Sequence, residues 1–306
     1  MSGRVVPTIL CAGVSVLDHI FYLERFPVPD AKTQARAFIT AVGGCAANAA
    51  IAIARLGGRV RFAAPLGGPA GEDTIGDHIL LGLTCEGIDC AGVVRVAGVA
   101  SSLSAILVDE DGERIIVNHR SNDLIAGRPA DPAALLRGID AVLIDNRFPE
   151  FVLPICEAAR QIALPIILDA DKPTRENDAL LAHATHVIFS AEGLRTTAGD
   201  DDLAGALKHI ASRIAAFVAV TDGANDILWL EEGALRRLAT FPVAAIDTLA
   251  AGDVFHGAFA LALAERSGEA EAIRFAAAAA AIKCTRAGGG SGAPTIRDVD
   301  DFLAAR

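Results

Sequence analysis

The chain has 306 residues, 52% of them hydrophobic, and it carries a formal net charge of -11 with a pI near 5.1. This acidic balance argues against a broad nucleic-acid or anionic-membrane surface, although a few cations can still bind a small anion inside a pocket. No secretion signal and no apolar run long enough to span a bilayer is visible, so we expect a cytoplasmic protein with six reduced cysteines.

The first third of the chain predicts one buried strand and part of a small sheet. Residues 5–16 are apolar and lead to Asp18. Residues 33–42 alternate as an exposed strand would, and 102–118 predict a hairpin around Asp109–Gly112. We expect a small antiparallel lid of about residues 31–42 and 101–120, inserted into a single domain that covers 1–306. A sheet that only decorates the surface or joins two copies is the alternative.

The second half alternates short apolar runs with helical stretches. The runs are 141–145, 165–169, 186–190 and 217–221, and residues 150–163 and 202–215 have helical spacing between them. This pattern predicts an α/β fold with a doubly wound, mostly parallel sheet. The runs end on Asp145, Asp169, Ser190 and Thr221, and ligands of such sheets bind beyond these carboxyl ends.

Two glycine clusters raise the question of a phosphate-binding loop. Gly43 and Gly44 precede a helix, in whose first turns Asn48 can hold a sugar hydroxyl or act as a structural cap. The cluster at 67–76 lacks the spacing of a dinucleotide fold, and no P-loop motif occurs. If the chain uses ATP, it does so through another architecture.

The stretch Asp247–Gly257 combines small residues with a carboxylate at the start of a helix. Ala250, Ala251 and Gly252 let a phosphate approach free backbone N–H groups, and Asp253 can take a proton from an attacking hydroxyl. The plainer interpretation is that Asp253 only favours the helix dipole and that the small residues pack tightly.

We expect no metal site made of the chain's own side chains. His183 and His186 are the one pair with suggestive spacing, and no third ligand follows nearby.

The chain resembles the ribokinase-like (PfkB) carbohydrate kinases over nearly its whole length, and three segments carry the resemblance. They are Gly43-Gly44 with Asn48, residues 71–76, and Asp247–Asp253, which matches the family pattern D-T-x-[GA]-A-G-D. The resemblance implies an ATP-dependent kinase with a β lid that often forms a dimer. It implies that Asp253 is the base, that the N–H groups of Ala250, Ala251 and Gly252 form an anion hole, and that Asp18, at the end of the first strand, holds substrate hydroxyls.

Within that family the chain is similar to the 6-deoxy-6-sulfofructose kinases. Lys32, Asn118 and Arg147 match the positions that hold the sulfonate there. Two cations and an amide from separate segments can converge on one anion, and Arg can bind two oxygens. The alternative is that Lys32 and Arg147 are solvated surface charges.

The nucleotide side departs from the family pattern. Ser190 begins the stretch that usually reads N-x-x-E, and Thr221 and Gly223 remain from a T-x-G-x-x-G turn in which Asp226 replaces a glycine. The resemblance implies that the enzyme uses ATP and Mg2+ as cofactors. Whether it also uses a monovalent cation such as K+ is left undecided by the sequence.

The expected function is therefore transfer of phosphate from ATP to a primary hydroxyl of a ketose, with 6-deoxy-6-sulfofructose as the leading acceptor and its 1-phosphate as the product. The expected partners are a sugar substrate and a second copy of the chain, bound through the lid. The alternatives are a ribokinase-, fructokinase- or nucleoside-kinase-type enzyme of the same fold, or a non-catalytic sugar-binding regulator.

Overall fold

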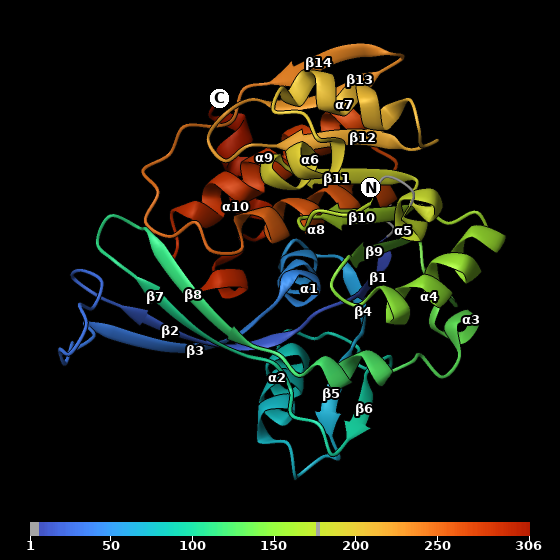
Figure 1. Cartoon of the computed structure of the whole chain (residues 1–306). Helices are drawn as coiled ribbons and strands as arrows, with labels where there is room; N and C mark the ends of the chain where they lie inside the picture. The colour runs from blue at the N-terminus through green and yellow to red at the C-terminus, as the bar shows by residue number, and fades with distance from the viewer. Residues whose placement is uncertain (1–5, 176–177) are drawn as a thin grey trace.

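A central eight-stranded sheet organises the molecule (Figure 1). The computed structural model describes residues 6–175 and 178–306. In spatial order the strands of the central sheet are β14 (Ala234–Leu238), β13 (Ile227–Glu231), β12 (Phe217–Thr221), β11 (His186–Ser190), β10 (Ile166–Ala170), β9 (Ala141–Asp145), β1 (Thr8–Ala12) and β4 (Arg59–Ala63). The last six of these run parallel, and the antiparallel β13 and β14 extend one edge.

The parallel strands are apolar on both faces, and successive side chains therefore enter two separate cores. Ile9 and Cys11 of β1 face one hydrophobic cluster, whereas Leu10 and Ala12 face the other. Helices cover both faces, which confirms the predicted doubly wound sheet.

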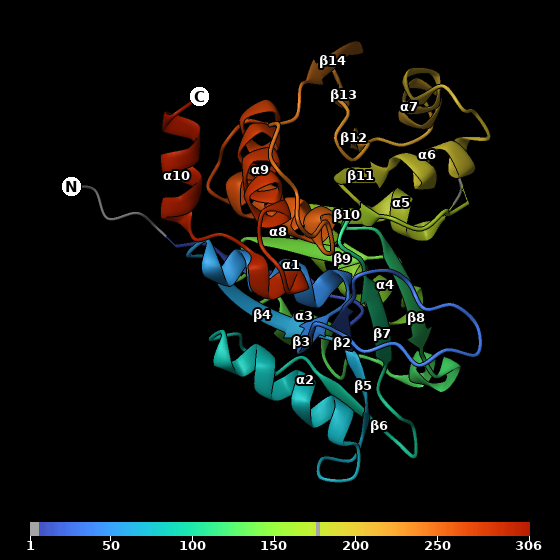
Figure 2. The ribbon, with the colours of Figure 1, turned by 90° about the vertical axis from the view of Figure 1, so that its left-hand side faces the viewer.

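The two helical layers differ in which parts of the chain supply them (Figures 1 and 2). One cluster contains residues of α1 (Cys45–Arg55), α8 (Ala251–Ala264), α9 (Glu269–Cys284) and α10 (Ile296–Ala304). The other contains residues of α4 (Pro149–Gln161), α5 (Ala179–His183), α6 (Ala191–Ala198) and α7 (Leu203–Ala211), and the short α3 (Pro132–Leu135) contacts α4. Among the described residues, no helix is long and apolar enough to cross a membrane.

A second, four-stranded sheet projects from the main body, with the order β3-β2-β7-β8 (Figure 1). It comprises β3 (Ala37–Gly43), β2 (Val16–Tyr22), β7 (Leu103–Val108) and β8 (Arg114–His119), and the predicted hairpin turn joins the last two. We call these four strands the lid sheet. The sequence prediction omitted β2. The expectation that Asp18 ends the first strand is wrong, because β1 ends at Ala12 and Asp18 lies inside β2.

A two-stranded parallel sheet of β5 (Pro65–Gly68) and β6 (Val94–Ala97) lies beside α2 (Thr74–Cys85). The glycine cluster at 67–76 belongs to this region, where Asp73 caps α2 by accepting a hydrogen bond from the N–H of Gly76. Two 3-10 helices, η1 (Asn122–Ala126) and η2 (Gly289–Gly292), complete the described elements.

Candidate active site

Polar side chains gather at the carboxyl ends of the parallel strands, as the sequence predicts. Asp145 ends β9 and lies in register with Asp169 of β10, while Ser190 and Thr221 pair at the ends of β11 and β12. Asp145 is buried and accepts hydrogen bonds from the N–H groups of Val14 and Ala46 at 2.7 and 3.2 Å. This edge of the sheet therefore forms a buried acidic floor.

Helix α8 begins above this floor with unusual backbone geometry. Ala250 precedes the helix with φ 63°, a left-handed conformation that is unfavourable for a residue with a side chain. The N–H of Ala251 donates to the carbonyl of Thr248 at 3.3 Å. Within the described residues the N–H groups of Ala250 and Gly252 make no hydrogen bond, so they are free to bind an anion.

Gly252 leaves open space at this helix start. A Cβ built on it meets no atom within 4 Å. The free N–H groups are therefore accessible to a ligand that approaches the first turn of α8.

Asp253 lies one position further along α8. Its Oδ2 accepts a hydrogen bond of 2.6 Å from the amide of Asn48. The pKa of Asp253 is raised to about 7: burial and the nearby carboxylate of Asp169 raise it, and the hydrogen bond from Asn48 lowers it in part. A carboxylate with a pKa near neutrality suits a general base.

Asn48 connects three segments that are far apart in the sequence. Its side chain donates to Asp253 and accepts from the N–H of Gly290 at 3.2 Å. The N-cap of α1 is Gly44, so Asn48 is not the helix cap. The contact depends on the close approach of α1 and α8, because a Cβ on Gly257 would lie 2.6 Å from the carbonyl oxygen of Ala49.

Asp18 reaches the site from the lid sheet. It pairs in register with Ser104 of β7, which pairs with Asn118 of β8, so the three side chains share one face. The Asn118 amide donates to the hydroxyl of Ser104 at 3.0 Å. The pKa of Asp18 is raised to about 7: burial and the charge of Asp253 raise it, and the hydrogen bond with Ser104 lowers it in part. A Cβ on Gly43 would lie 1.8 Å from the Asp18 carboxylate, which explains the glycine there.

The three residues predicted to hold an anion come from three segments of the chain, and each has its own surroundings. Arg147 follows β9, is partly buried and forms an ion pair with Asp171. Asn118 is bonded to Ser104, whereas Lys32 is exposed in the connection between β2 and β3. Among the described residues, no hydrogen bond or ion pair joins Lys32 to either of the other two.

The predicted nucleotide residues lie along one part of the sheet edge. Ser190 caps α6 by accepting from the N–H of Gly193, and its hydroxyl donates to the carbonyl of Asp171 at 3.0 Å. Thr221 ends β12, and Gly223 follows in a turn with φ 58°. Ser190 and Thr221 are thus neighbours at the carboxyl ends of β11 and β12.

The sequence analysis assigned no role to His256, which lies one turn into α8. Its two ring nitrogens lie 2.7 and 3.3 Å from the carbonyl oxygens of Gly252 and Ile188, and Nε2 is 3.6 Å from Asp169. The i, i+4 spacing from Gly252 places it on the same helix face. The pattern Gly252-x-x-x-His256 was visible in the sequence, but a small-residue helix start alone gives no reason to expect a buried histidine.

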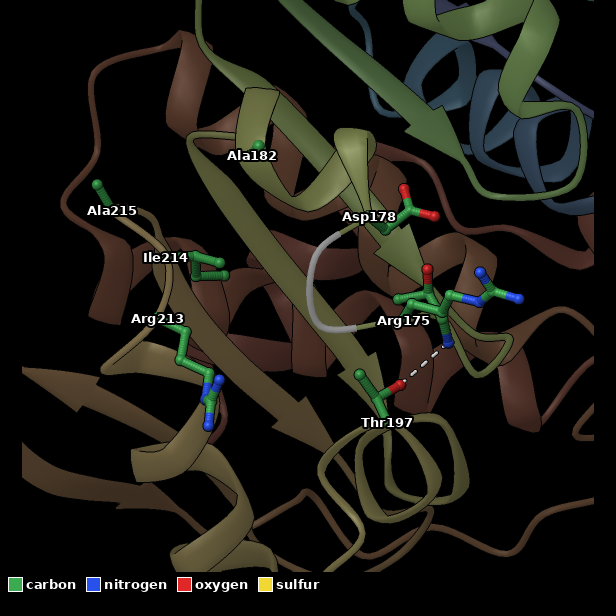
Figure 3. Close-up of a pocket in the computed structure, with 8 residues that line it drawn as sticks. Arg175, Asp178, Ala182, Thr197, Arg213, Ile214 and Ala215 are labelled. Atoms are coloured by element: carbon green, nitrogen blue, oxygen red, sulfur yellow. Dashed lines mark hydrogen bonds between the residues drawn. The ribbon is translucent and has the colours of Figure 1, made fainter.

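All six cysteines are free. The ring of His183 hydrogen-bonds the carbonyl oxygen of Ala179, and that of His186 hydrogen-bonds the hydroxyl of Thr185. A separate cavity of about 1090 Å³ lies between α5, α6 and the connection to β12 (Figure 3). None of the predicted site residues lines it.

Comparison with known proteins agrees with this geometry. The sequence profile of the pfkB family carbohydrate kinases matches residues 6–296. The chain belongs to this family and is an ATP-dependent carbohydrate kinase, so the alternative of a non-catalytic regulator is not supported.

Two curated relatives and two solved structures illustrate the similarity. The chain is 30% identical over 311 residues to a ribokinase of Haemophilus influenzae, with 97% of this chain and 98% of the relative covered. It is 26% identical over 294 residues to a ribokinase of Bacillus subtilis, with 95% and 98% covered. A crystal structure from Agrobacterium tumefaciens, assigned as a ribokinase, superposes with a TM-score of 0.93 at 35% identity and covers 98% of both chains. Arabidopsis thaliana ribokinase complexed with ribose and ATP gives 0.81 at 23% identity, with 98% and 99% covered.

Proposed function

We propose that the chain phosphorylates a primary hydroxyl of a ketose at the start of α8, with Asp253 as the base. The observation that carries this proposal is the combination of a partly buried carboxylate of raised pKa, that of Asp253, with the free N–H groups of Ala250 and Gly252 within the three preceding residues. Asp18 faces the same space from the lid sheet and is a suitable acceptor for hydrogen bonds from sugar hydroxyls.

The proposed step moves one proton and one phosphoryl group. The acceptor hydroxyl gives its proton to Asp253, its oxygen forms a bond to the γ-phosphorus of ATP, and the bond to the β–γ bridging oxygen breaks to release ADP. The N–H groups of Ala250 and Gly252 stabilise the negative charge on the transferred phosphoryl group. Asn48 holds the Asp253 carboxylate in place through its 2.6 Å hydrogen bond.

We propose that Mg2+ accompanies the ATP phosphates. The Sγ of Cys45 and carboxylate oxygens of Asp169 and Asp253 lie within 4.8 Å of one another. Mg2+ prefers oxygen, and burial raises the pKa of the Cys45 thiol, so the carboxylate of Asp169 is the better candidate ligand. Its Oδ1 is buried without a hydrogen-bond partner among the described residues. Bound Mg2+ would neutralise charge on the phosphate oxygens.

We propose an anionic group at the far end of the acceptor, as in 6-deoxy-6-sulfofructose. Arg147 supports this choice because its guanidinium is partly buried at the carboxyl end of β9 and its Nε makes no hydrogen bond within the described residues. Asn118 lies on the same sheet face as Asp18. Lys32 is exposed in the β2–β3 connection and is the third residue of the proposed anion site. The similarity to ribokinases favours ribose as the competing acceptor.

Arg147→Ala separates these acceptors. We expect it to raise the KM for sulfofructose by about ten- to a hundredfold, because it removes a charge-assisted hydrogen bond, while the KM for ATP stays the same. ADP release is measured with sulfofructose, fructose 6-phosphate, fructose, ribose, deoxy-ketogluconate and nucleosides. Arg297→Ala, which removes an 89% exposed side chain on α10, is the control. The proposal of an anionic acceptor is wrong if the wild type has its highest kcat/KM with ribose or a nucleoside and Arg147→Ala leaves that value unchanged.

We also propose that the lid sheet closes over the site and pairs with a second copy of the chain. Its edge strand β8 leaves Ile115, Ile116 and Val117 44%, 49% and 64% exposed, and Phe38 of β3 is 53% exposed. An exposed apolar edge strand readily pairs with another strand. Sedimentation velocity reports the resulting oligomeric state.

A further inference from the structure

A buried lysine lies beneath the turn that leads into α8, and the catalytic step described above does not use it. Lys283 is the penultimate residue of α9, and its side chain is 0% exposed. Its Nζ donates to the carbonyl oxygen of Asp247 at 2.8 Å and lies 3.5 Å from the Oδ2 of the same residue. The ammonium therefore contacts both the backbone and the side chain at the first residue of the turn.

Both carboxylate oxygens of Asp247 also accept hydrogen bonds from other groups. Its Oδ1 accepts from the N–H of Leu249 at 2.8 Å, and its Oδ2 accepts from the N–H of Gly288 at 3.0 Å and from the hydroxyl of Tyr22 at 3.2 Å. These bonds join the turn to the lid sheet through Tyr22 and to the loop before η2 through Gly288. Lys283 supplies the positive charge that this buried carboxylate needs.

The backbone of the turn needs such an anchor. Ala250 has φ 63°, which costs free energy and persists only where the surroundings hold it. The N–H groups of Ile246 and Asp247 both donate to the carbonyl of Cys284, the residue after Lys283. The end of α9 thus fixes the position of the turn at Ile246 and Asp247, three residues before the free N–H of Ala250.

A role in stability alone does not account for this lysine. Burial lowers the pKa of Lys283, and the charge of Asp247 raises it again in part. Buried ion pairs often stabilise a fold no better than apolar side chains of the same size. The Lys283–Asp247 pair lies at the first residue of the turn that would bind the anion, so it can act directly on the position of that turn.

We propose that Lys283 is a positioning residue, a built-in cation that holds Asp247–Ala250 so that the N–H groups of Ala250 and Gly252 point at the transferred phosphoryl group. The proposal rests on the proposed function for its effect on turnover. Lys283 should also keep the backbone of the turn ordered when no substrate is bound.

Lys283→Met tests the positioning role, because it keeps the length of the side chain and removes the charge. We expect kcat to fall about a hundredfold, as when a donor of an anion hole is lost, with the KM for ATP and sugar changed less than threefold. The exposed Lys208→Met of α7 is the control. Hydrogen exchange of the peptide around 246–255 should become faster in Lys283→Met only. A folded variant with wild-type kcat and unchanged exchange would overturn the proposal.

Two further variants keep the test decisive if Lys283→Met does not fold. Asp247→Asn/Lys283→Met removes both charges and keeps a side-chain oxygen that can accept a hydrogen bond at position 247, so wild-type kcat in this folded double variant would also overturn the proposal. In Lys283→Ala we expect ammonium or K+ ions to restore part of kcat, and tetramethylammonium, which is too large for the vacated space, to restore none.

The same salts added to the wild type test whether the enzyme requires K+. If the wild type releases no ADP with any acceptor, the proposed function fails, whereas the exchange experiment still tests Lys283.

Discussion

Asp253→Asn is expected to lower kcat by roughly a hundred- to ten-thousandfold, because the amide cannot take the proton of the acceptor hydroxyl. The substitution keeps the shape of the side chain, and its amide can still bond the Asn48 side chain after an amide flip. The KM for ATP should change little, since the free N–H groups at the start of α8 remain. Initial rates of ADP release at saturating sugar and ATP measure the effect.

A matched carboxylate gives the control for this variant. Asp300→Asn makes the same change on the exposed surface of α10 and should leave kcat unchanged. Circular dichroism should show both variants folded. Near wild-type kcat in folded Asp253→Asn would mean that another group accepts the proton.

Gly252→Ala is the second change with a large expected effect. The residue has no positive φ, and a Cβ there meets no protein atom within 4 Å, so the folded protein accepts the methyl group. Alanine in the helix should stabilise the fold by about 0.5–1 kcal/mol. The methyl group occupies the open space through which the phosphoryl group would approach, so we expect kcat to fall by roughly a hundredfold or more, comparable with the loss of an anion-hole donor.

The opposite signs of these two effects make the test sharp. Thermal unfolding should show Gly252→Ala at least as stable as the wild type while its activity is low. Gly268→Ala, which adds a methyl group in open space at the start of α9, provides the control for activity. If Gly252→Ala retains full activity, the phosphoryl group does not pass over the first turn of α8.

The parts of the site that lie at element ends could be predicted from the sequence. Asp145, Ser190 and Thr221 end apolar runs, and Asp253 follows small residues before a helix, so local pattern was enough to place them. Asp18 was misplaced because residues 5–16 look like one continuous strand, whereas the chain leaves the central sheet after Ala12 and enters the lid sheet at Val16.

Contacts between distant segments could not be predicted in this way. Asn48 and Asp253 are 205 positions apart, and their hydrogen bond exists because Gly257 lets α1 and α8 approach closely. Lys283 had the appearance of an ordinary basic residue in the last turn of a helix, which is usually solvated. Only the tertiary fold shows that Asp247 meets it in the interior.

The pH dependence of kcat/KM for the sugar, at saturating ATP and Mg2+, tests the central claim most directly. Because the pKa of Asp253 is raised to about 7, the base is protonated below that pH, and activity should fall as the pH decreases through 7 and be full above it. Asp18, with a pKa also near 7, would steepen this fall, and Asp18→Asn should leave the slope of a single proton. A profile that stays flat down to about pH 5, near the range of an unperturbed carboxyl group, would contradict the assignment of Asp253 as a base of raised pKa.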